Sequence, residues 1–370
     1  MNFGVINESS KIENRAGLTP SSVSFLIEKG HSVYVQAGAG LKAGYTNEEY
    51  VSQGAGIVFT KEEVFGRADV VLNISPLDEE ECNLAKENQV LFGFHHLAVT
   101  RKCNVEVLLK KKIIVMGYEI VQEKTGILPF IESLSEVAGQ MCLVISGHYL
   151  QTTYGGRGVI IGGVVSVPPA TAVIIGSAVL AKSAVKALLG AGANTLVLGH
   201  NMERLRELEE MTSGKVITLI ASKYNLARMT KVADILIGAV LRPGEKAPIM
   251  VTRDMVKSMK KGSLIIDLAI DQGGCIETSR LTTLEQPTYV EEGVIHYCVP
   301  NITSAVSRTS TKVLSNLVTP YLLKIGEIGI EKTLEKDFSL ARGVYIYKGS
   351  ITKQNIAERF GLSYKEIFHV

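Results

Sequence analysis

Short apolar runs rich in β-branched residues alternate with helical patterns along most of the chain. In the first third these runs predict strands at residues 3–6, 32–36, 69–74, 90–94 and 112–117. Helical patterns lie between them, such as "TPSSVSFLIEKG", with a proline in the first turn and a glycine at the end. Strands that alternate with helices predict a parallel sheet covered by helices on both faces.

A long helical pattern separates this region from a second alternating region. Residues 129–150 contain no helix breaker except two isolated glycines, and a Gly/Pro-rich loop follows at 154–170. Nearly continuous apolar runs then predict strands buried on both faces. They lie at residues 172–175, 195–199, 215–219, 234–240, 263–270 and 294–299. A second long helix is expected at 305–329, before a short strand or turn and a final helix.

The predicted fold class is α/β, with two doubly wound, Rossmann-like parallel-sheet domains, a cleft between them and two long connecting helices. The first, substrate domain is expected to be discontinuous, at residues 1–130 plus 305–370, and a cofactor domain is inserted at 131–304. A chain of 370 residues suits two domains.

Composition and charge narrow the function classes. The net charge is +2, so no basic surplus indicates nucleic-acid binding. No apolar run approaches the roughly 20 residues of a membrane helix, and the N-terminus lacks the pattern of a signal peptide. The five cysteines are scattered without a CxxC pair, which favours reduced thiols in a cytoplasmic protein. No metal site is predicted.

The stretch "VIIGSAVLAKSAVKALLGAGANTLVLGH" at residues 173–200 has the strand–turn–helix–strand order of a dinucleotide-binding unit. Gly176, Ala178 and Ala181 occupy its three glycine positions. Val179 follows at the helix N-terminus, which offers N–H groups to a pyrophosphate. A plain buried βαβ unit is the alternative interpretation.

The second strand of this unit ends without the acidic residue that usually binds the ribose hydroxyls. Gly199 occupies that position, followed by three residues that we also assign to the cofactor site: His200, Asn201 and Arg204. Arg206 lies a little further on. A missing acid with arginines nearby suits a 2′-phosphate, so NAD and NADP both remain open.

Motifs along the whole chain carry a more specific signal. They include "ENRAGLTPSSV", "HHLA", "GYEIVQ", "LSEVAGQM", "GGRGVIIGGV", "SLIIDLAIDQGGCIETSR" and "PTYVEEGVIHYCVPNI". Together they resemble the alanine dehydrogenase family, which includes the first domain of proton-translocating transhydrogenase. The resemblance implies NAD(H) in the interdomain cleft, reductive amination of pyruvate, and a homo-oligomer, a hexamer or a dimer, with a small-molecule substrate.

Three candidate functional residues follow from matching the family's motifs. Arg15 in "ENRAGLTP" would bind the substrate carboxylate, because a guanidinium can do so through two hydrogen bonds. His96 in "HHLA" would be the general acid and base, with His95 beside it. Asp271 in "AIDQGG" would lie near the substrate amine and the cofactor. Their alternative interpretations are a surface arginine, a structural histidine and a turn-capping aspartate.

The fourth functional residue of the family is absent. The family motif "LKVKEP" reads "LNISPL" here, so Asn73 and Ser75 replace two lysines, the second of which binds the substrate oxo group. Further departures fall at Val165, Ser166, Thr303, Ser304 and Ser307, which we expect near the same cleft. The remaining cofactor candidates are Ser135, with Glu136 beside it, Ala239, Val240, Leu241, Asp271 and Asn301.

Three functions are therefore open. The first is an NAD(P)-dependent oxidoreductase of alanine dehydrogenase type, acting on a small amino, 2-oxo or imino acid other than pyruvate. A preformed imine needs less polarisation than a ketone, which would make the missing lysine tolerable. The second is a genuine alanine dehydrogenase with another basic residue, such as Lys11, in the lysine's place. The third is a homologue that keeps the scaffold without redox chemistry or catalysis.

Overall fold

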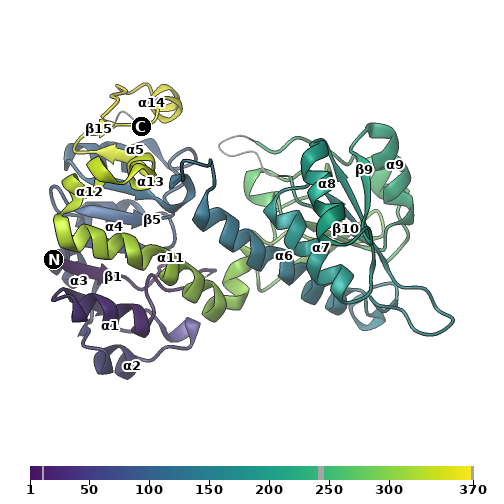
Figure 1. The fold of residues 1–370 in the computed structure, drawn as a ribbon, viewed down its shortest axis with the longest axis horizontal. Helices are drawn as coiled ribbons and strands as arrows, with labels where there is room; N and C mark the ends of the chain where they lie inside the picture. Colours follow the sequence, from purple (N-terminus) through teal and green to yellow (C-terminus); the bar gives the residue numbers. More distant parts are fainter. Residues whose placement is uncertain (11, 241–245, 368–370) are drawn as a thin grey trace. The chain divides into compact units, whose positions relative to one another are not determined.

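The predicted strand–helix alternation folds into two α/β units, each built on its own sheet (Figure 1). The computed structural model describes residues 1–10, 12–240 and 246–367. The first unit comprises Met1–Ser133 and Val306–Val370, and the second comprises Leu134–Ala305. Which unit carries the substrate and which the cofactor remains a prediction.

The sheet of the first unit has the order β15-β14-β6-β5-β4-β1-β2-β3. The strands from β3 to β6 run parallel, whereas β14 and β15 are antiparallel additions at one edge. Their bounds are β1 Asn2–Val5, β2 Ser32–Gln36, β3 Gly56–Val58, β4 Val70–Asn73, β5 Val90–Gly93, β6 Ile114–Gly117, β14 Val344–Tyr347 and β15 Ser350–Ile351. The sequence pattern missed β3 because three residues are too few to show a period.

Short capped helices connect these strands. Thr46, Thr60 and Asp78 each form a capping box at the start of α2, α3 and α4. The helices and short 3₁₀ turns are α1 Pro20–Glu28, η1 Leu41–Ala43, α2 Asn47–Ser52, α3 Lys61–Arg67, α4 Glu79–Leu84, α5 Lys102–Lys110, η2 Tyr118–Ile120, α11 Ser307–Ile328, α12 Ile330–Lys336, α13 Phe338–Arg342 and α14 Gln354–Phe360.

The returning helix α11 is joined to the loop before α1 through buried hydroxyls. The N–H of Ala16 donates to Thr311 Oγ1 at 3.0 Å, and the N–H of Thr19 donates to Ser315 Oγ at 2.9 Å. These bonds join segments far apart in the sequence, so residues 306–370 and 1–133 form one unit.

The sheet of the second unit has the order β12-β13-β11-β10-β7-β8-β9, with only β12 antiparallel to its neighbour. The strand bounds are β7 Thr171–Ile175, β8 Asn194–Gly199, β9 Ile217–Ile220, β10 Ile235–Gly238, β11 Leu264–Asp267, β12 Thr288–Glu291 and β13 Val294–Tyr297. The helical elements are α6 Pro129–Tyr149, which begins in the first unit, η3 Thr152–Tyr154, α7 Val179–Gly190, α8 Met202–Met211, α9 Lys223–Val232, α10 Arg253–Lys257, η4 Ile270–Gln272 and η5 Ile302–Val306. Apolar clusters cover both faces of this sheet.

Both sheets share one strand order. The parallel strands run β3-β2-β1-β4-β5-β6 in the first unit and β9-β8-β7-β10-β11-β13 in the second. In the first sheet, β2 and β3 lie on one side of β1, and the later strands β4, β5 and β6 lie on its other side, so the order reverses between β1 and β4. In the second sheet, the order reverses in the same way between β7 and β10. Ligands of such sheets bind at this switch point, outside the carboxyl ends of the strands. Each unit therefore has its own predicted ligand-binding edge.

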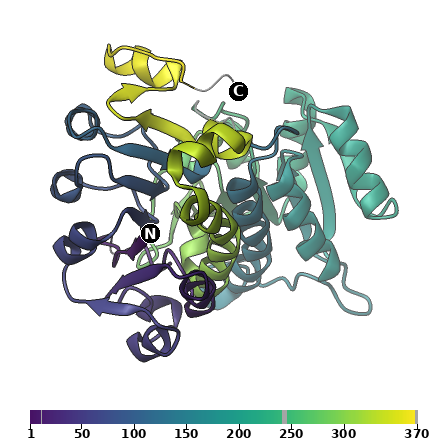
Figure 2. The ribbon, with the colours of Figure 1, turned by 60° about the vertical axis from the view of Figure 1, so that its left-hand side comes forward.

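Two expectations from the sequence are wrong. The strand at 215–219 is not buried on both faces, because β9 lies at the sheet edge and leaves Ile217 and Ile220 48% and 42% exposed. Val165 and Ser166 do not lie at the ligand-binding edge of the second sheet. They precede β7, at its amino end, in a loop that extends from the unit in both views, and Val165 is 95% exposed (Figures 1 and 2). Across the described ranges, no helix has the length and apolarity needed to span a bilayer.

Candidate functional site

Arg15 is a buried residue of the loop that follows β1, and its charge is already paired. Its side chain donates from Nε to Glu13 Oε1 at 2.7 Å and from Nη2 to Glu13 Oε2 at 2.6 Å. The two side chains are only 4% and 2% exposed. Lys42 Nζ also donates to the Glu13 carbonyl at 3.2 Å. A substrate carboxylate would therefore meet a guanidinium whose Nε–Nη2 side is bound to Glu13.

The end of β4 carries Asn73 and Ser75 at the positions of the family's two lysines. The Asn73 side chain is fully buried and donates from Nδ2 to the carbonyl of Ser75 at 2.8 Å. Its close packing requires glycine on β5, because a Cβ on Gly93 would lie 2.0 Å from the Asn73 carbonyl. Ser75 itself is partly exposed. The site therefore has an amide and a hydroxyl where the resemblance implies two ammonium groups.

Glu8, which follows β1, binds the backbone of the residues just after β4. Its carboxylate accepts the N–H of Ile74 at 2.6 Å and the N–H of Ser75 at 2.9 Å. Burial, together with the nearby carboxylates of Glu13 and Glu81, raises the pKa of Glu8 to about 7, against the opposing effect of the two backbone bonds. Glu8 can therefore change its charge near neutral pH.

The two neighbouring histidines after β5 have different environments. His95 is buried, and burial lowers its pKa to about 3, so it stays neutral at physiological pH. The side chain of His96 is 48% exposed and stacks on Phe94, with ring centroids 5.7 Å apart. The structure thus leaves His96 as the histidine of this pair with access to solvent.

Glu119, just after β6, holds the His95–His96 backbone. Its Oε1 accepts the N–H of His96 at 2.6 Å, the N–H of His95 at 3.3 Å and the hydroxyl of Tyr345 at 3.1 Å. The same oxygen lies 3.9 Å from His96 Nδ1. His96 has a φ of 44°, a left-handed conformation uncommon outside glycine, and these bonds support it.

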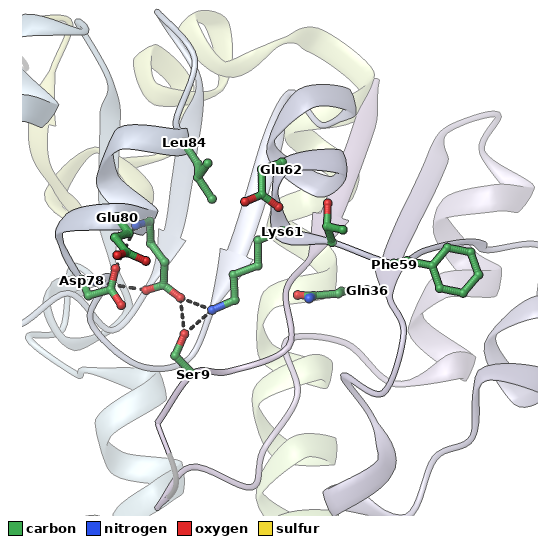
Figure 3. A pocket seen from close by; sticks show the side chains of 10 residues that line it. Ser9, Gln36, Phe59, Lys61, Glu62, Asp78, Glu80 and Leu84 are labelled. Carbon is green, nitrogen blue, oxygen red and sulfur yellow. Dashed lines mark hydrogen bonds and ion pairs between the residues drawn. The ribbon is translucent and has the colours of Figure 1, made fainter.

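A hollow on the same edge of the first sheet was not anticipated from the sequence (Figure 3). Lys61, the first residue of α3, donates hydrogen bonds from Nζ to Ser9 Oγ and Glu81 Oε1 (Figure 3). Ser9 Oγ in turn donates to Glu81 Oε1 at 2.6 Å. The other residues that line it are Gln36, Phe59, Thr60, Glu62, Asp78, Glu80 and Leu84. Lys61 is thus a cation near the end of β1, but Glu81 neutralises it.

In the second unit, the β7–α7 turn has the form of a phosphate-binding turn. Gly176 has a φ of 124°, and a Cβ there would lie 2.3 Å from the carbonyl oxygen of Ala239. Ala178 is the N-cap of α7 with a φ of −82°, so alanine fits without strain, and no side chain caps the first N–H groups of the helix. Those uncapped N–H groups suit a pyrophosphate at this turn, and the contact with Ala239 requires glycine at position 176.

The end of β8 offers basic side chains and no acid at the ribose position. Gly199 is buried there, and His200 is exposed. The Asn201 side chain caps α8 by accepting the N–H of Arg204 at 3.0 Å. Lys182 pairs with Glu207 nearby. The uncharged Gly199 and the basic side chains near it could accommodate either a ribose hydroxyl or a 2′-phosphate.

The remaining cofactor candidates of the second unit lie on several elements. Ala239 and Val240 follow β10 directly, whereas Leu241 lies outside the described residues, as does Lys11 in the first unit. Ser135 is partly buried in α6, and the Glu136 carbonyl accepts a hydrogen bond from Ser183 Oγ at 2.6 Å. Asn301 has a φ of 52° and accepts a hydrogen bond from Thr303 Oγ1, and Ser304 is buried. In the first unit, Ser307 Oγ donates to the carbonyl of Lys42 at 2.7 Å.

Asp271 is exposed in the short turn η4 after β11. The buried carboxylate of Asp267, at the end of β11, holds this loop. It accepts the N–H groups of Ala269 at 3.1 Å and Cys275 at 3.0 Å. Burial raises the pKa of Asp267, and the bonds that it accepts oppose this shift. Asp271 therefore sits on a loop anchored at both ends.

The structure brings the predicted residues together within each unit. Arg15, Ser75 and His96 lie at the carboxyl edge of the first sheet, and Gly176, Gly199, Ala239 and Asp271 lie at that of the second. Sequence reasoning assigned no role to Glu8, Glu13, Lys61 or Glu119. Each of them except Glu13 lies within three residues of the carboxyl end of a strand, and that position is the signal that could have found them.

Comparisons with known proteins agree with this arrangement. Two family models match, "Alanine dehydrogenase/PNT, N-terminal domain" at residues 4–138 and "Alanine dehydrogenase/PNT, C-terminal domain" at residues 142–354. An alanine dehydrogenase of Methanococcus maripaludis is 42% identical over 98% of both chains. One of Staphylococcus haemolyticus is 40% identical over 99% of this chain and 98% of that one.

Solved structures show the same fold. An L-alanine dehydrogenase superposes with a TM-score of 0.93 at 37% identity, covering 98% of this chain and 99% of that one. The transhydrogenase from Sinorhizobium meliloti superposes with a TM-score of 0.83 at 20% identity, covering 95% of this chain and 100% of that one. The second likeness concerns the fold alone.

Proposed function

Because this chain belongs to the alanine dehydrogenase/PNT family, we propose that it is an NAD(P)-dependent oxidoreductase acting on a small amino, 2-oxo or imino acid other than pyruvate. The observation that carries the choice of substrate is Ser75. A lysine there would supply a positive charge to polarise a ketone, and a serine hydroxyl supplies only a dipole.

The residues of the second unit fit a nicotinamide dinucleotide. Gly176 permits a backbone approach that a Cβ would block, and the uncapped N–H groups at the start of α7 can bind phosphate oxygens. When bound, the nicotinamide would supply or accept a hydride. Arg204 and His200, with Gly199 in place of an acid, support binding of NADPH as well as NADH.

The residues of the first unit would handle the substrate. Arg15, held by Glu13, would bind the carboxylate. His96, exposed and held by Glu119, would give or take the proton. Asp271, which occupies the aspartate position of the family motif "AIDQGG", would orient the amine or imine. The missing charge at Ser75 costs least for an imine, because an imine is more basic than a ketone and can carry the proton itself.

A genuine alanine dehydrogenase is the second candidate, favoured by full-length similarity to proteins of that name. It requires another cation in the place of the lysine. Lys61 and Lys42 lie on this side of the sheet, but each already binds a partner, Glu81 or the Glu13 carbonyl.

One experiment separates these two hypotheses. The purified protein is titrated with NADH and with NADPH by fluorescence, and oxidation is then assayed with a panel of 2-oxo acids plus ammonia. We expect cofactor binding, weak or no turnover of pyruvate, and turnover of another acid. Failure to bind either cofactor would contradict both hypotheses, and efficient pyruvate amination would establish the second. Ser75→Lys should raise pyruvate amination, and a variant without that gain would show that the serine is not the decisive change.

The assembly and surroundings of the protein are also proposals. The resemblance supports a homo-oligomer and a cytoplasmic location, which analytical ultracentrifugation and cell fractionation would test.

A further inference from the structure

The switch point of the first sheet presents hydrogen-bond acceptors. It lies between β1 and β4, where the strand order reverses, and ligands of such sheets bind outside the carboxyl ends at this point. The N–H groups of Ile74 and Ser75 would be the donors there, but the Glu8 carboxylate occupies both, at 2.6 and 2.9 Å. An anionic ligand therefore finds a carboxylate where it would need N–H groups.

Asn73 and Glu8 both have unused capacity to accept hydrogen bonds at this point. Asn73 is fully buried, and its Oδ1 has no hydrogen-bond partner among the described residues, although its Nδ2 is bound to the Ser75 carbonyl. Each oxygen of Glu8 accepts one backbone N–H and has a second lone pair. A buried acceptor without a partner is costly, and a ligand that donates hydrogen bonds would satisfy it.

The local charge is also unbalanced. Three carboxylates interact here: Glu13 pairs with Arg15, Glu81 pairs with Lys61, and Glu8 has no ion-pair partner in the described part of the chain. Tyr118 has a buried hydroxyl that also lacks a partner among the described residues; burial raises the pKa of its phenol, and the nearby Glu8 charge raises it further. Among the described residues, the Glu8 carboxylate therefore has no positive charge to balance it.

We propose that this switch point, formed by Glu8, Asn73 and Ser75, binds the ammonium group of a substrate side chain. The inference rests on the proposed function and specifies its substrate class: an amino acid, or its oxo or imino counterpart, with a second amine. An alkylammonium carries three N–H donors and one positive charge. It would donate to Glu8 and Asn73 and supply the charge that the lysines at positions 73 and 75 supply in the family.

Size supports the same assignment. Replacing two lysine side chains with Asn73 and Ser75 removes several methylenes as well as two charges. Ser75 is partly exposed, so a small ligand can reach this end of β4.

The proposal predicts a pH dependence of binding. With a pKa of about 7, Glu8 is largely protonated at pH 6 and ionised at pH 8. The other titratable and charged groups that face it are Glu13, Glu81 and Tyr118, with the ion-pair partners Arg15 and Lys61. Affinity for a cationic side chain should therefore rise from pH 6 to pH 8.

The test is calorimetric binding of L-2,4-diaminobutyrate and of L-norvaline, its neutral counterpart of the same length, each with and without saturating NADH. L-Ornithine and L-lysine extend the series, and ammonium chloride and potassium chloride are separate arms. We expect the best diamino acid to bind about tenfold to a hundredfold more tightly than its neutral counterpart at pH 8. The difference should shrink at pH 6.

Substitutions at the proposed site test whether it causes the preference for diamino acids. Glu8→Gln should remove most of the preference for the diamino acid over L-norvaline. Ser75→Lys, which introduces its own ammonium, should abolish the preference even if Glu8→Gln folds poorly. The matched control is Glu80→Gln, which removes one exposed carboxylate from α4 and should change nothing.

The possible results separate this inference from the proposed function. Equal affinity for charged and neutral ligands, in both cofactor conditions, would overturn it. Binding of ammonium or potassium ions that does not compete with the diamino acid would also overturn the inference. The site would then hold a free cation and not the side chain of a substrate. Absence of NADH binding and of turnover would overturn the proposed function and leave the binding comparison without cofactor intact.

Discussion

Glu119 Oε1 accepts the backbone N–H of His96 at 2.6 Å and lies 3.9 Å from Nδ1 of the same residue. One carboxylate oxygen thus binds the backbone of the candidate acid–base residue and lies near its ring. The neighbouring N–H of His95 and the hydroxyl of Tyr345 bind the same oxygen, so segments after β5 and β6 and in β14 all meet at it.

Glu119→Ala should misplace His96, because the left-handed backbone at His96 loses its acceptor. We expect kcat/KM to fall about 10- to 100-fold, with NADH affinity unchanged. Glu119→Gln should recover most of the activity, because an amide oxygen still accepts these N–H groups. Steady-state kinetics measure kcat/KM, and NADH fluorescence measures the affinity for NADH, in both variants. Equal losses in the two variants would show that charge, and not positioning, is the role of Glu119.

Gly176→Ala should damage both stability and cofactor binding. The new Cβ would lie 2.3 Å from the Ala239 carbonyl oxygen, at a φ of 124° that side chains rarely adopt. We expect a loss of about 2 kcal/mol or more in the free energy of unfolding and at least about tenfold weaker NADH binding. Ala178→Gly is the control and should change stability by less than about 1 kcal/mol. Chemical denaturation and fluorescence titration measure the two effects, and a Gly176→Ala variant that matched wild type in both would refute the tight turn.

Gly199→Asp should shift cofactor preference towards NADH. A carboxylate at the end of β8 would accept the ribose hydroxyls of NADH and repel the 2′-phosphate of NADPH. Its Cβ would meet Leu205 and Ser177 at 3.1 Å, a close fit that needs only a small adjustment. We expect the ratio of the two dissociation constants to change about tenfold or more.

The control for charge alone is Ser213→Asp, which adds a carboxylate after α8 in an exposed position. It should leave the ratio of NADH to NADPH affinity unchanged. A shift of the same size in both variants would mean that the end of β8 does not contact the cofactor.

Glu8 should make the unliganded protein less stable as pH rises from about 5 to about 8. Its pKa is raised from 4.5 to about 7 in the folded state, so the native protein binds the proton more tightly than the unfolded chain. Stability is therefore lost as pH rises through this window, by up to about 3 kcal/mol.

Glu8→Gln should flatten this pH slope, and Glu80→Gln should not. The comparison concerns the slope, because glutamine also leaves one backbone N–H of residues 74 and 75 facing an N–H₂ group. Urea denaturation at several pH values measures it. If the free energy of unfolding depends on pH equally in wild type and Glu8→Gln, a group other than Glu8 causes that dependence.

Local pattern in the chain was enough to predict most of the fold. Apolar runs predicted the strands that became β1, β2, β4 to β8, β10, β11 and β13, because a buried parallel strand needs apolar side chains on both faces. The helices at 129–150 and 305–329 appear as α6 and α11. The pattern failed for β3, which is too short, and missed β12 at Thr288–Glu291. It also failed for the burial of β9, since an edge position depends on strand order and not on local composition.

The candidate residues Arg15, His96 and Asp271 came from motifs, and their assigned roles remain predictions. The motif chose His96, and the fold adds that burial keeps His95 neutral whereas His96 is exposed. The pairing of Arg15 with Glu13 and the contact of Glu119 with His96 also came from the structure.

Glu8 shows most clearly which features the sequence predicts and which only the fold decides. In the sequence it is one glutamate among many, 66 residues from Ile74, and nothing in the spacing joins them. The parallel pairing of β1 with β4 brings the ends of these strands together, and the Glu8 carboxylate then binds the backbone of residues 74 and 75. The local sequence selects strands and helices through side-chain periodicity. Only strand order, a long-range property of the folded chain, decides which polar groups meet at the carboxyl edge and which of them are left without a partner.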